Sequence, residues 1–291
     1  MMDSTVAFRD ALQNVYGPLD WLPIPDGSIQ RFHVPGDNPG TRNGWYVLFV
    51  DDIACGVFGS WKVGGSQTWS SRKPANYLEA QIFNQRIEQA KRQREAERRQ
   101  LRQDTAERAN RLWRNARPAN PNHPYLAAKG VRTYALRQIG DVLLVPLTRY
   151  GLLVSIQRIN PDGDKRFLSG GMTKGCCSLI GTIQPDQPLY ICEGWATGAT
   201  IHAETGATVA CAMTAGNLLE VGQRLQRQHP DAVLIIAGDD DRMTEGNPGR
   251  TAAIKAAATL GCGLIFPPWC GSEPLTLSDF NDLRQWQEAH Q

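Results

Sequence analysis

The last hundred residues alternate short apolar runs with helical stretches, and this alternation restricts the fold more than any other feature. Apolar runs rich in Val, Ile and Leu predict strands at 188–194, 207–213, 231–238 and 262–267. The stretches between and after them, such as GRTAAIKAAATLG, have the composition of helices about a dozen residues long. Apolar strands separated by helices form βαβ units, so we predict an α/β fold with a parallel sheet flanked by helices.

Acidic residues follow two of the predicted strands. Glu193 ends PLYICEG, and Asp239, Asp240 and Asp241 end DAVLIIAGDDD. Parallel strands end at one edge of a sheet, where ligand sites lie. Side chains two positions apart point the same way, so Asp239 and Asp241 can converge with Glu193 while Asp240 turns away. Three carboxylates suit Mg²⁺, which we predict here; the alternative is that the aspartates cap a helix or occupy a solvated turn.

Composition excludes several other classes of protein. The 291 residues are 41% hydrophobic, enough for a core, and no apolar run has the length of a membrane span. The beginning, MMDSTVAFRDALQNVYG, lacks the features of a signal peptide, which predicts a cytoplasmic protein without a membrane partner. The seven cysteines include no C-x-x-C pair and no Cys/His cluster at zinc spacing, so no structural zinc is expected.

Charge is distributed unevenly along the chain. The net charge is +2, but residues 187–291 hold 12 acidic and only 6 basic residues. The preceding part therefore carries the positive excess. This pattern favours a polyanion as the partner of the basic residues before 187 and cations as ligands of the acidic residues 187–291. The alternative is ordinary solvated charge.

Composition shifts divide the chain into four predicted domains. Residues 1–76 form a β-rich module without zinc cysteines, and 77–117 a long charged connector helix. Three prolines in RPANPNHPYL end that helix. A basic, glycine-containing subdomain follows at 118–186, and the domain with the parallel sheet occupies 187–291.

Two features of the front have alternative interpretations. Trp45, Trp61 and Trp69 either pack in the core of the β-rich module or stack on nucleic-acid bases, and core packing is favoured. Apolar residues are sparse in the middle of the long helix, at Ala90, Ala96 and Leu101. That stretch is therefore either a solvated connector, which we favour, or a nucleic-acid-binding arm.

The acidic motifs resemble a known domain. ICEGWATGATIHAETG, followed by IIAGDDDR and GRTAAIKAAA, is similar to the Toprim domain of DnaG-type primases, topoisomerases, and certain nucleases and recombination proteins. The signature of that domain is a Glu after one strand and D-x-D after another. The resemblance implies a Toprim-type parallel sheet in which Glu193, Asp239 and Asp241 are catalytic and bind metal.

Upstream motifs narrow the resemblance to one group. HPYLAAKGV, DVLLVPL and SIQRINPDGDKRFLSGGMTKG resemble the mixed α/β primase core of phage and plasmid primases, and SDFNDL is typical of the same group. The resemblance covers residues 118–291. It implies that basic residues face the template and nucleotide, namely Arg158, Lys165, Arg166 and Lys174. Asp279 and Asp282 either join the acidic cluster, or Asp279 caps the last helix.

The function implied by this resemblance is that of a DNA primase of the mobile-element type. Such an enzyme makes short primers on single-stranded DNA from nucleoside triphosphates with Mg²⁺ or Mn²⁺, and a replicative helicase is its expected partner. The zinc ribbon typical of DnaG-type primases is missing, but GWYVLFVDDIACGVFGSWKVGG resembles the leader of mobile-element primases. The alternatives are a Toprim nuclease and a non-catalytic single-stranded-DNA-binding module.

Overall fold

A computed structural model of this chain describes residues 3–185 and 187–290. The chain divides into two compact units, Met1–Gln100 and Leu101–Gln291, which we call the N-terminal and C-terminal units. Helix α2 (Tyr77–Asn115) contributes to both. The predicted domain limits at residues 1, 186 and 291 lie outside the described residues.

The N-terminal unit is an antiparallel sheet with helices on both faces. Its strands pair in the order β1-β2-β3-β4. Aromatic and β-branched residues such as those of GWYVLF favour this pleated structure. Helix α1, which the sequence analysis missed, begins where the Asp3 carboxylate accepts a hydrogen bond from the Thr5 N–H. Besides the first part of α2, the elements are α1 (Ser4–Tyr16), β1 (Gln30–Phe32), β2 (Gly44–Phe49), β3 (Cys55–Ser60) and β4 (Gln67–Ser70).

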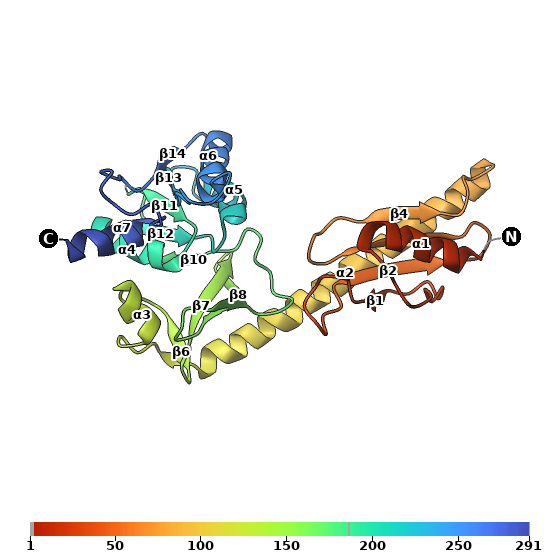
Figure 1. Cartoon of the computed structure of the whole chain (residues 1–291), viewed down its shortest axis with the longest axis horizontal. Coiled ribbons are helices and arrows are strands. Elements are labelled where there is room, and N and C mark those ends of the chain that lie inside the picture. Colours follow the sequence, from red (N-terminus) through yellow and green to blue (C-terminus); the bar gives the residue numbers. More distant parts are fainter. Residues whose placement is uncertain (1–2, 186, 291) are drawn as a thin grey trace. The chain divides into compact units, whose positions relative to one another are not determined.

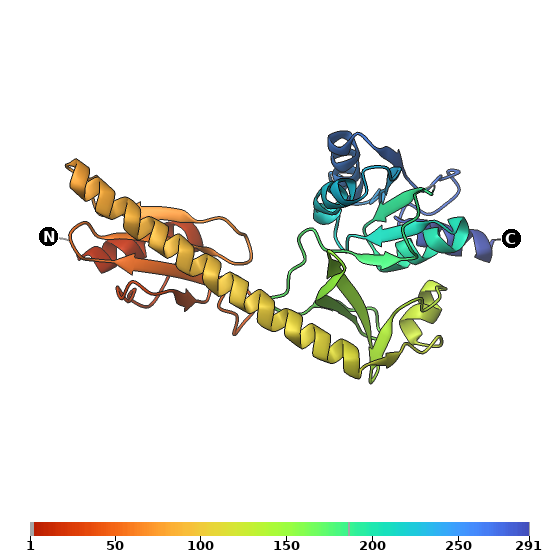
Figure 2. The ribbon, with the colours of Figure 1, turned by 180° about the vertical axis from the view of Figure 1, so that it is seen from behind.

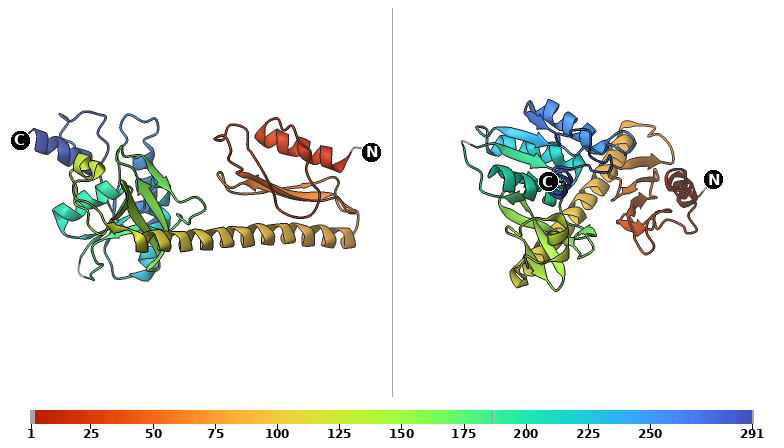
Figure 3. Two further views of the ribbon diagram at one scale, coloured as in Figure 1. Left: turned by 90° about the horizontal axis from the view of Figure 1, so that it is seen from below. Right: turned by 60° about the vertical axis from the view of Figure 1, so that its left-hand side comes forward.

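Each face of this sheet has its own hydrophobic cluster. Phe8 and Leu12 of α1 pack on one face, and Ile87 and Ala90 of α2 pack on the other, beside Trp45. Figure 3 shows the sheet between the two helices. Trp45 is fully buried, which confirms core packing for that tryptophan. Ala90 is also fully buried, so this part of α2 packs on a face of the sheet and is not a solvated connector.

Helix α2 is long because its sequence lacks helix breakers. Its 39 residues contain no Gly or Pro and are rich in Ala, Gln, Glu and Arg. Within the part of the chain that the structure describes, none of the helices combines the length and apolar character needed to cross a membrane.

The first half of the C-terminal unit is an antiparallel sheet with strands in the order β5-β6-β7-β8-β9. Ala109 and Ala116 of α2 pack on one face against Leu144, Ile156 and Leu168. Figure 2 shows these last turns of α2 beside the strands. The elements are β5 (Arg117–Pro118), α3 (Pro124–Lys129), β6 (Arg137–Ile139), β7 (Val142–Arg149), β8 (Leu152–Ile159) and β9 (Lys165–Phe167).

The second half contains the predicted parallel sheet, with strands in the order β10-β12-β11-β13-β14. Four strands are parallel, and β10 adds an antiparallel edge that the sequence analysis did not expect. Helix α4 packs on one face and helices α5 and α6 pack on the other (Figure 1). The elements are β10 (Ser178–Ile180), β11 (Leu189–Cys192), α4 (Trp195–Thr205), β12 (Thr208–Cys211), the 3₁₀ helix η1 (Ala215–Asn217), α5 (Leu218–Gln228), β13 (Leu234–Ala237), α6 (Pro248–Leu260), β14 (Gly263–Ile265) and α7 (Phe280–Ala289).

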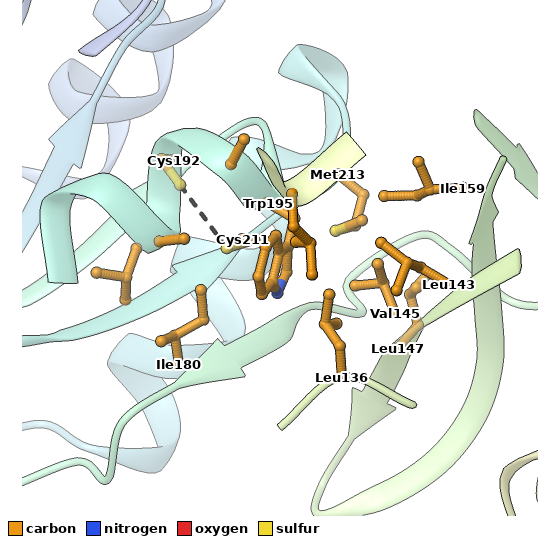
Figure 4. Packing of buried hydrophobic residues seen from close by; sticks show 14 of the residues in the cluster. Leu136, Leu143, Val145, Leu147, Ile159, Ile180, Cys192, Trp195, Cys211 and Met213 are labelled. Atoms are coloured by element: carbon orange, nitrogen blue, oxygen red, sulfur yellow. Dashed lines mark hydrogen bonds between the residues drawn. The ribbon is translucent and has the colours of Figure 1, made fainter. Parts of the chain in front are cut away.

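One hydrophobic cluster joins the two sheets of the C-terminal unit. Leu143, Val145 and Ile159 of the antiparallel sheet contribute to the same cluster as Trp195 of α4 and Met213. Figure 4 shows the Trp195 side chain with Cys211 and Ile180 on one side and Leu136, Leu143 and Val145 on the other. Trp195 is 2% exposed, and burying a side chain of this size contributes on the order of 2–3 kcal/mol. The antiparallel sheet is thus packed firmly against the face of the parallel sheet that carries α4.

Candidate metal site at the carboxyl edge of the parallel sheet

The acidic residues are carried by two neighbouring strands. Strands β11 and β13 pair in parallel, and the last residues of each, Cys192 and Ala237, lie opposite one another. Glu193 follows Cys192 directly, and Asp239 follows Ala237 after one glycine. Both carboxylates therefore emerge at the carboxyl edge of the sheet.

Asp239 has the most perturbed carboxyl group of this edge. Burial raises its pKa to about 8, and the neighbouring charges of Asp279, Glu193 and Asp241 add to the rise. Its Oδ1 atom is buried and has no hydrogen-bond partner within the described chain. Such an oxygen is costly in its ionised form unless a cation lies beside it. The group therefore has the properties of a metal ligand.

Glu193 is perturbed in the same direction. Burial raises its pKa and the Asp241 and Asp279 carboxylates contribute, whereas a backbone hydrogen bond from Ala215 and the Lys165 ammonium oppose the rise. The pKa values of two adjacent carboxyl groups are thus raised at one sheet edge. Perturbation of this kind is concentrated at functional sites.

The carboxylates do not converge into a closed cage. Among residues 3–185 and 187–290, no three His, Cys, Asp or Glu side chains are grouped so that they could hold a metal ion together. One reason is that Asp241 Oδ2 accepts a hydrogen bond of 2.9 Å from the Gly249 N–H at the start of α6. Mg²⁺ usually takes only one or two carboxylates directly and keeps several waters, so this open arrangement still suits it.

Asp240 is turned away from the other acids, as predicted from strand geometry. Its side chain is buried and accepts hydrogen bonds from Asn247 Nδ2 at 2.7 Å and Trp269 Nε1 at 3.0 Å. It also pairs with Arg250 at 3.3 Å. Burial opposes its ionisation, but these partners together outweigh burial and hold its pKa below the ordinary value. Asp240 therefore anchors the loop around Trp269.

The Asp240→Asn substitution should affect stability and leave metal binding in place. The amide loses the ion pair with Arg250 and cannot accept both present hydrogen bonds, so we expect the free energy of unfolding to fall by about 2 kcal/mol. Urea unfolding measures that loss, and calorimetric titration with Mg²⁺ measures metal affinity. A folded variant that no longer binds Mg²⁺ would place Asp240 in the metal site.

Asp279 both caps the last helix and belongs to the acidic edge. Its Oδ1 accepts a hydrogen bond of 2.8 Å from the Asp282 N–H, and through this bond Asp279 is the N-cap of α7. Its Oδ2 accepts a hydrogen bond of 2.9 Å from Thr197 Oγ1. Its charge also contributes to raising the pKa of Asp239. Asp282 pairs with Lys129 at 3.2 Å. The two alternatives for Asp279 are therefore compatible.

The four predicted basic residues lie in three different places. Lys165 of β9 lies opposite Ile159 of β8 in the strand register, so both side chains are on the same face of the sheet. Ile159 is buried in the hydrophobic cluster that faces the parallel sheet. Arg158 and Arg166 pair at the next position, so they lie on the opposite face of the antiparallel sheet. Lys174 lies on a separate loop and pairs with Glu220 at 2.7 Å.

Lys165 is the basic residue beside the acids. Part of its side chain is exposed, but the surrounding protein desolvates the ammonium group and lowers its pKa. Lys129 lowers the pKa further, while Asp279, Asp239 and Glu193 oppose the shift. Lys165 Nζ also lies 5.5 Å from the centre of the Tyr125 ring. A cation from the antiparallel sheet thus stands at the edge of the carboxylate group.

Sequence reasoning missed several residues that organise this edge. Thr197 lies four positions after Glu193 in the first turn of α4, and this spacing could have indicated its role. Lys129 ends α3 just before Gly130, a position where basic residues are common in helices of any function. Its pairing with Asp282 spans 153 positions, which no local pattern reveals.

Comparison with known proteins agrees with this geometry. Residues 188–289 match the family model described as Toprim domain, which confirms the predicted resemblance. Two Escherichia coli proteins, both named DNA primase TraC, are each 33% identical to this chain. The alignments span 289 and 264 residues, cover 91% and 86% of this chain, and cover 26% and 18% of those proteins. The chain thus corresponds to about a quarter or less of the length of these relatives.

Proposed function

We propose that this chain, whose residues 188–289 match the Toprim domain, is a DNA primase of the mobile-element type that makes primers on single-stranded DNA. The reaction is template-directed, Mg²⁺-dependent nucleotidyl transfer from nucleoside triphosphates. The observation that carries the proposal is the buried carboxylate of Asp239, whose Oδ1 has no hydrogen-bond partner among the described residues, beside Glu193 and with Lys165 at the edge of the group. The similarity of most of the chain to two DNA primases supports it.

The residues present fit a divalent metal ion. Asp239 would hold Mg²⁺, or Mn²⁺, through its free oxygen, with Asp241 as the second carboxylate. When bound, the metal would supply charge stabilisation for the triphosphate and the leaving pyrophosphate. Glu193, with its raised pKa, can accept the proton of the primer 3′-hydroxyl or serve as a further ligand.

The basic residues would act on phosphates according to their positions. Lys165 lies closest to the acids and would contact the incoming nucleotide. Lys174, Arg158 and Arg166 are exposed and would contact the phosphates of the template strand. A replicative helicase is the partner we propose, and the cytoplasm is the proposed location.

Incubation with single-stranded DNA, labelled ribonucleotides and Mg²⁺ or Mn²⁺ tests the proposal. Short new oligonucleotides are expected from the native chain and none from the Asp239→Asn variant prepared in the same way. A shortened template would instead indicate a Toprim nuclease. Unchanged DNA in a stable complex would indicate a non-catalytic binding module.

A further inference from the structure

The turn between β12 and α5 contacts the acidic edge. The backbone N–H of Met213 donates to the Glu193 carbonyl at 2.8 Å, and Ala215 provides the backbone hydrogen bond to the Glu193 carboxylate. Met213 has a φ of +71°, a left-handed conformation that costs a non-glycine residue about 1–3 kcal/mol. The surrounding contacts must therefore hold this turn in place, because strain of this size would otherwise relax.

Asn217, at the end of the same turn, reaches away from the acids to another loop. It is 7% exposed. Its Nδ2 donates to the carbonyls of Thr173 at 3.1 Å, Cys176 at 3.0 Å and Ala212 at 2.8 Å, and its Oδ1 accepts from the Gly175 N–H at 2.7 Å. One buried carboxamide thus holds the backbone on both sides of Lys174.

The loop that Asn217 holds is a tight turn with Lys174 at its outer corner. The Cys176 N–H donates to the Thr173 carbonyl at 2.9 Å, and Gly175 adopts a φ of +69° that favours glycine. Arg224, which is also buried, donates from Nε to the Gly175 carbonyl at 2.8 Å. The backbone of the turn is fixed from two directions.

The Lys174 side chain remains accessible despite this fixed backbone. Its side chain is 70% exposed, and within the described residues it forms an ion pair with Glu220, whose side chain is itself 39% exposed. An ion pair this open contributes little stability, so a phosphate can replace Glu220. The arrangement is a rigid backbone that presents a mobile cation.

We propose that Asn217 is a positioning residue that holds Lys174 for a phosphate of the single-stranded template. Three of the four hydrogen bonds of Asn217 go to residues next to or within two positions of Lys174. Ordering the loop beforehand reduces the conformational entropy lost when the phosphate binds. This inference rests on the proposed function, because it takes template DNA as the ligand.

The salt dependence of DNA binding tests this role. Fluorescence anisotropy with a labelled single-stranded oligonucleotide, over a series of salt concentrations, gives the slope of log K against log salt. Loss of one phosphate contact makes that slope less steep by about 0.7 for a single strand. We expect the slope to become less steep by this amount in Lys174→Ala and by the same amount in Asn217→Ala. The slope of the double variant should equal that of either single variant.

Gln138→Ala is the matched control. Gln138 is also a buried carboxamide of the C-terminal unit, 4% exposed, and it bonds to Asn120 and Gly140 instead of the Lys174 loop. Its variant should lose stability and keep the native slope. If Asn217→Ala does not fold, Asn217→Ser, which keeps one donor, replaces it, and faster hydrogen exchange at residues 173–177 should accompany its altered slope.

Two outcomes would overturn the inference. One is a native slope in the folded Asn217 variant, and the other is a double variant whose slope changes by about 1.4, the sum expected of independent contacts. A native chain that binds DNA with the expected slopes but makes no primers would instead overturn the proposed function. Those results would leave the role of Asn217 supported.

Discussion

Asp239→Asn should abolish primer synthesis, with a loss of at least about a thousandfold, while single-stranded DNA binding stays within about twofold of native. The substitution keeps the size of the side chain but removes the negative charge at Oδ1, a buried oxygen without a hydrogen-bond partner among the described residues. A thousandfold loss corresponds to about 4 kcal/mol of transition-state stabilisation, which is reasonable for a carboxylate that holds the metal. We expect Glu193→Gln to lose synthesis to a similar degree.

The neighbouring Asp240→Asn provides a matched control for this experiment. It makes the same chemical change one position along the chain, where the carboxylate binds Trp269 and Arg250 instead of facing the acids. Assayed well below its unfolding temperature, it should still synthesise primers. Full synthesis by both Asp239→Asn and Glu193→Gln would contradict the metal site, because neither charge would then be needed.

The sheet edge could be predicted because its information is local. Each of the four parallel strands is a short apolar run, and each is followed by a helix of ordinary composition. Parallel connection brings the strand ends together, so the positions of Glu193 and Asp239 in sequence were sufficient to place them at one edge. The opposite direction of Asp240 followed from the same alternation.

The basic residues show where this local information ends. Lys165 and Arg166 were predicted to act together, but they are adjacent in β9 and therefore lie on opposite faces of the sheet. The sequence could not indicate which face meets the acids, because that depends on the pairing of Lys165 with Ile159 and on the packing of Ile159 against the parallel sheet. Asn217 was missed for a similar reason: three of its four hydrogen-bond partners lie 41–44 positions away.

The N-terminal unit was predicted less completely. The strands were recognised from aromatic and β-branched residues, but α1 was missed and α2 was interpreted as a connector in its middle. Apolar residues are few in the middle of α2, but one of them, Ala90, buries its whole side chain against the sheet. A helix can pack closely through alanine, so low apolar content did not mean a solvated face.

The raised pKa of Asp239 also has a consequence for stability. Its ordinary value is 3.8, and its value in the folded chain is about 8. Between these values the folded state retains a proton that the unfolded state has released, so the unfolding free energy falls as pH rises. The stabilisation is fully present below about pH 4 and is lost as pH passes through about 8. Each pH unit contributes at most about 1.4 kcal/mol, so the stabilisation lost by pH 8 is on the order of a few kcal/mol.

Asp239→Asn should therefore raise the melting temperature in metal-free buffer at pH 8, even though it abolishes synthesis. An amide removes the carboxylate that is unfavourable when ionised, and a few kcal/mol corresponds to about 5–10 °C for a unit of this size. The two proteins should have the same melting temperature near pH 4, where Asp239 is largely protonated in both the folded and the unfolded state of the native chain.

Mg²⁺ at pH 8 should stabilise the native chain and not the variant, because the ion offsets the charge that the variant lacks. Thermal unfolding of both proteins across this pH range, with and without Mg²⁺, measures these differences. Equal stabilisation of both by Mg²⁺, or a difference in melting temperature that does not change with pH, would show that the perturbed carboxyl group is not Asp239.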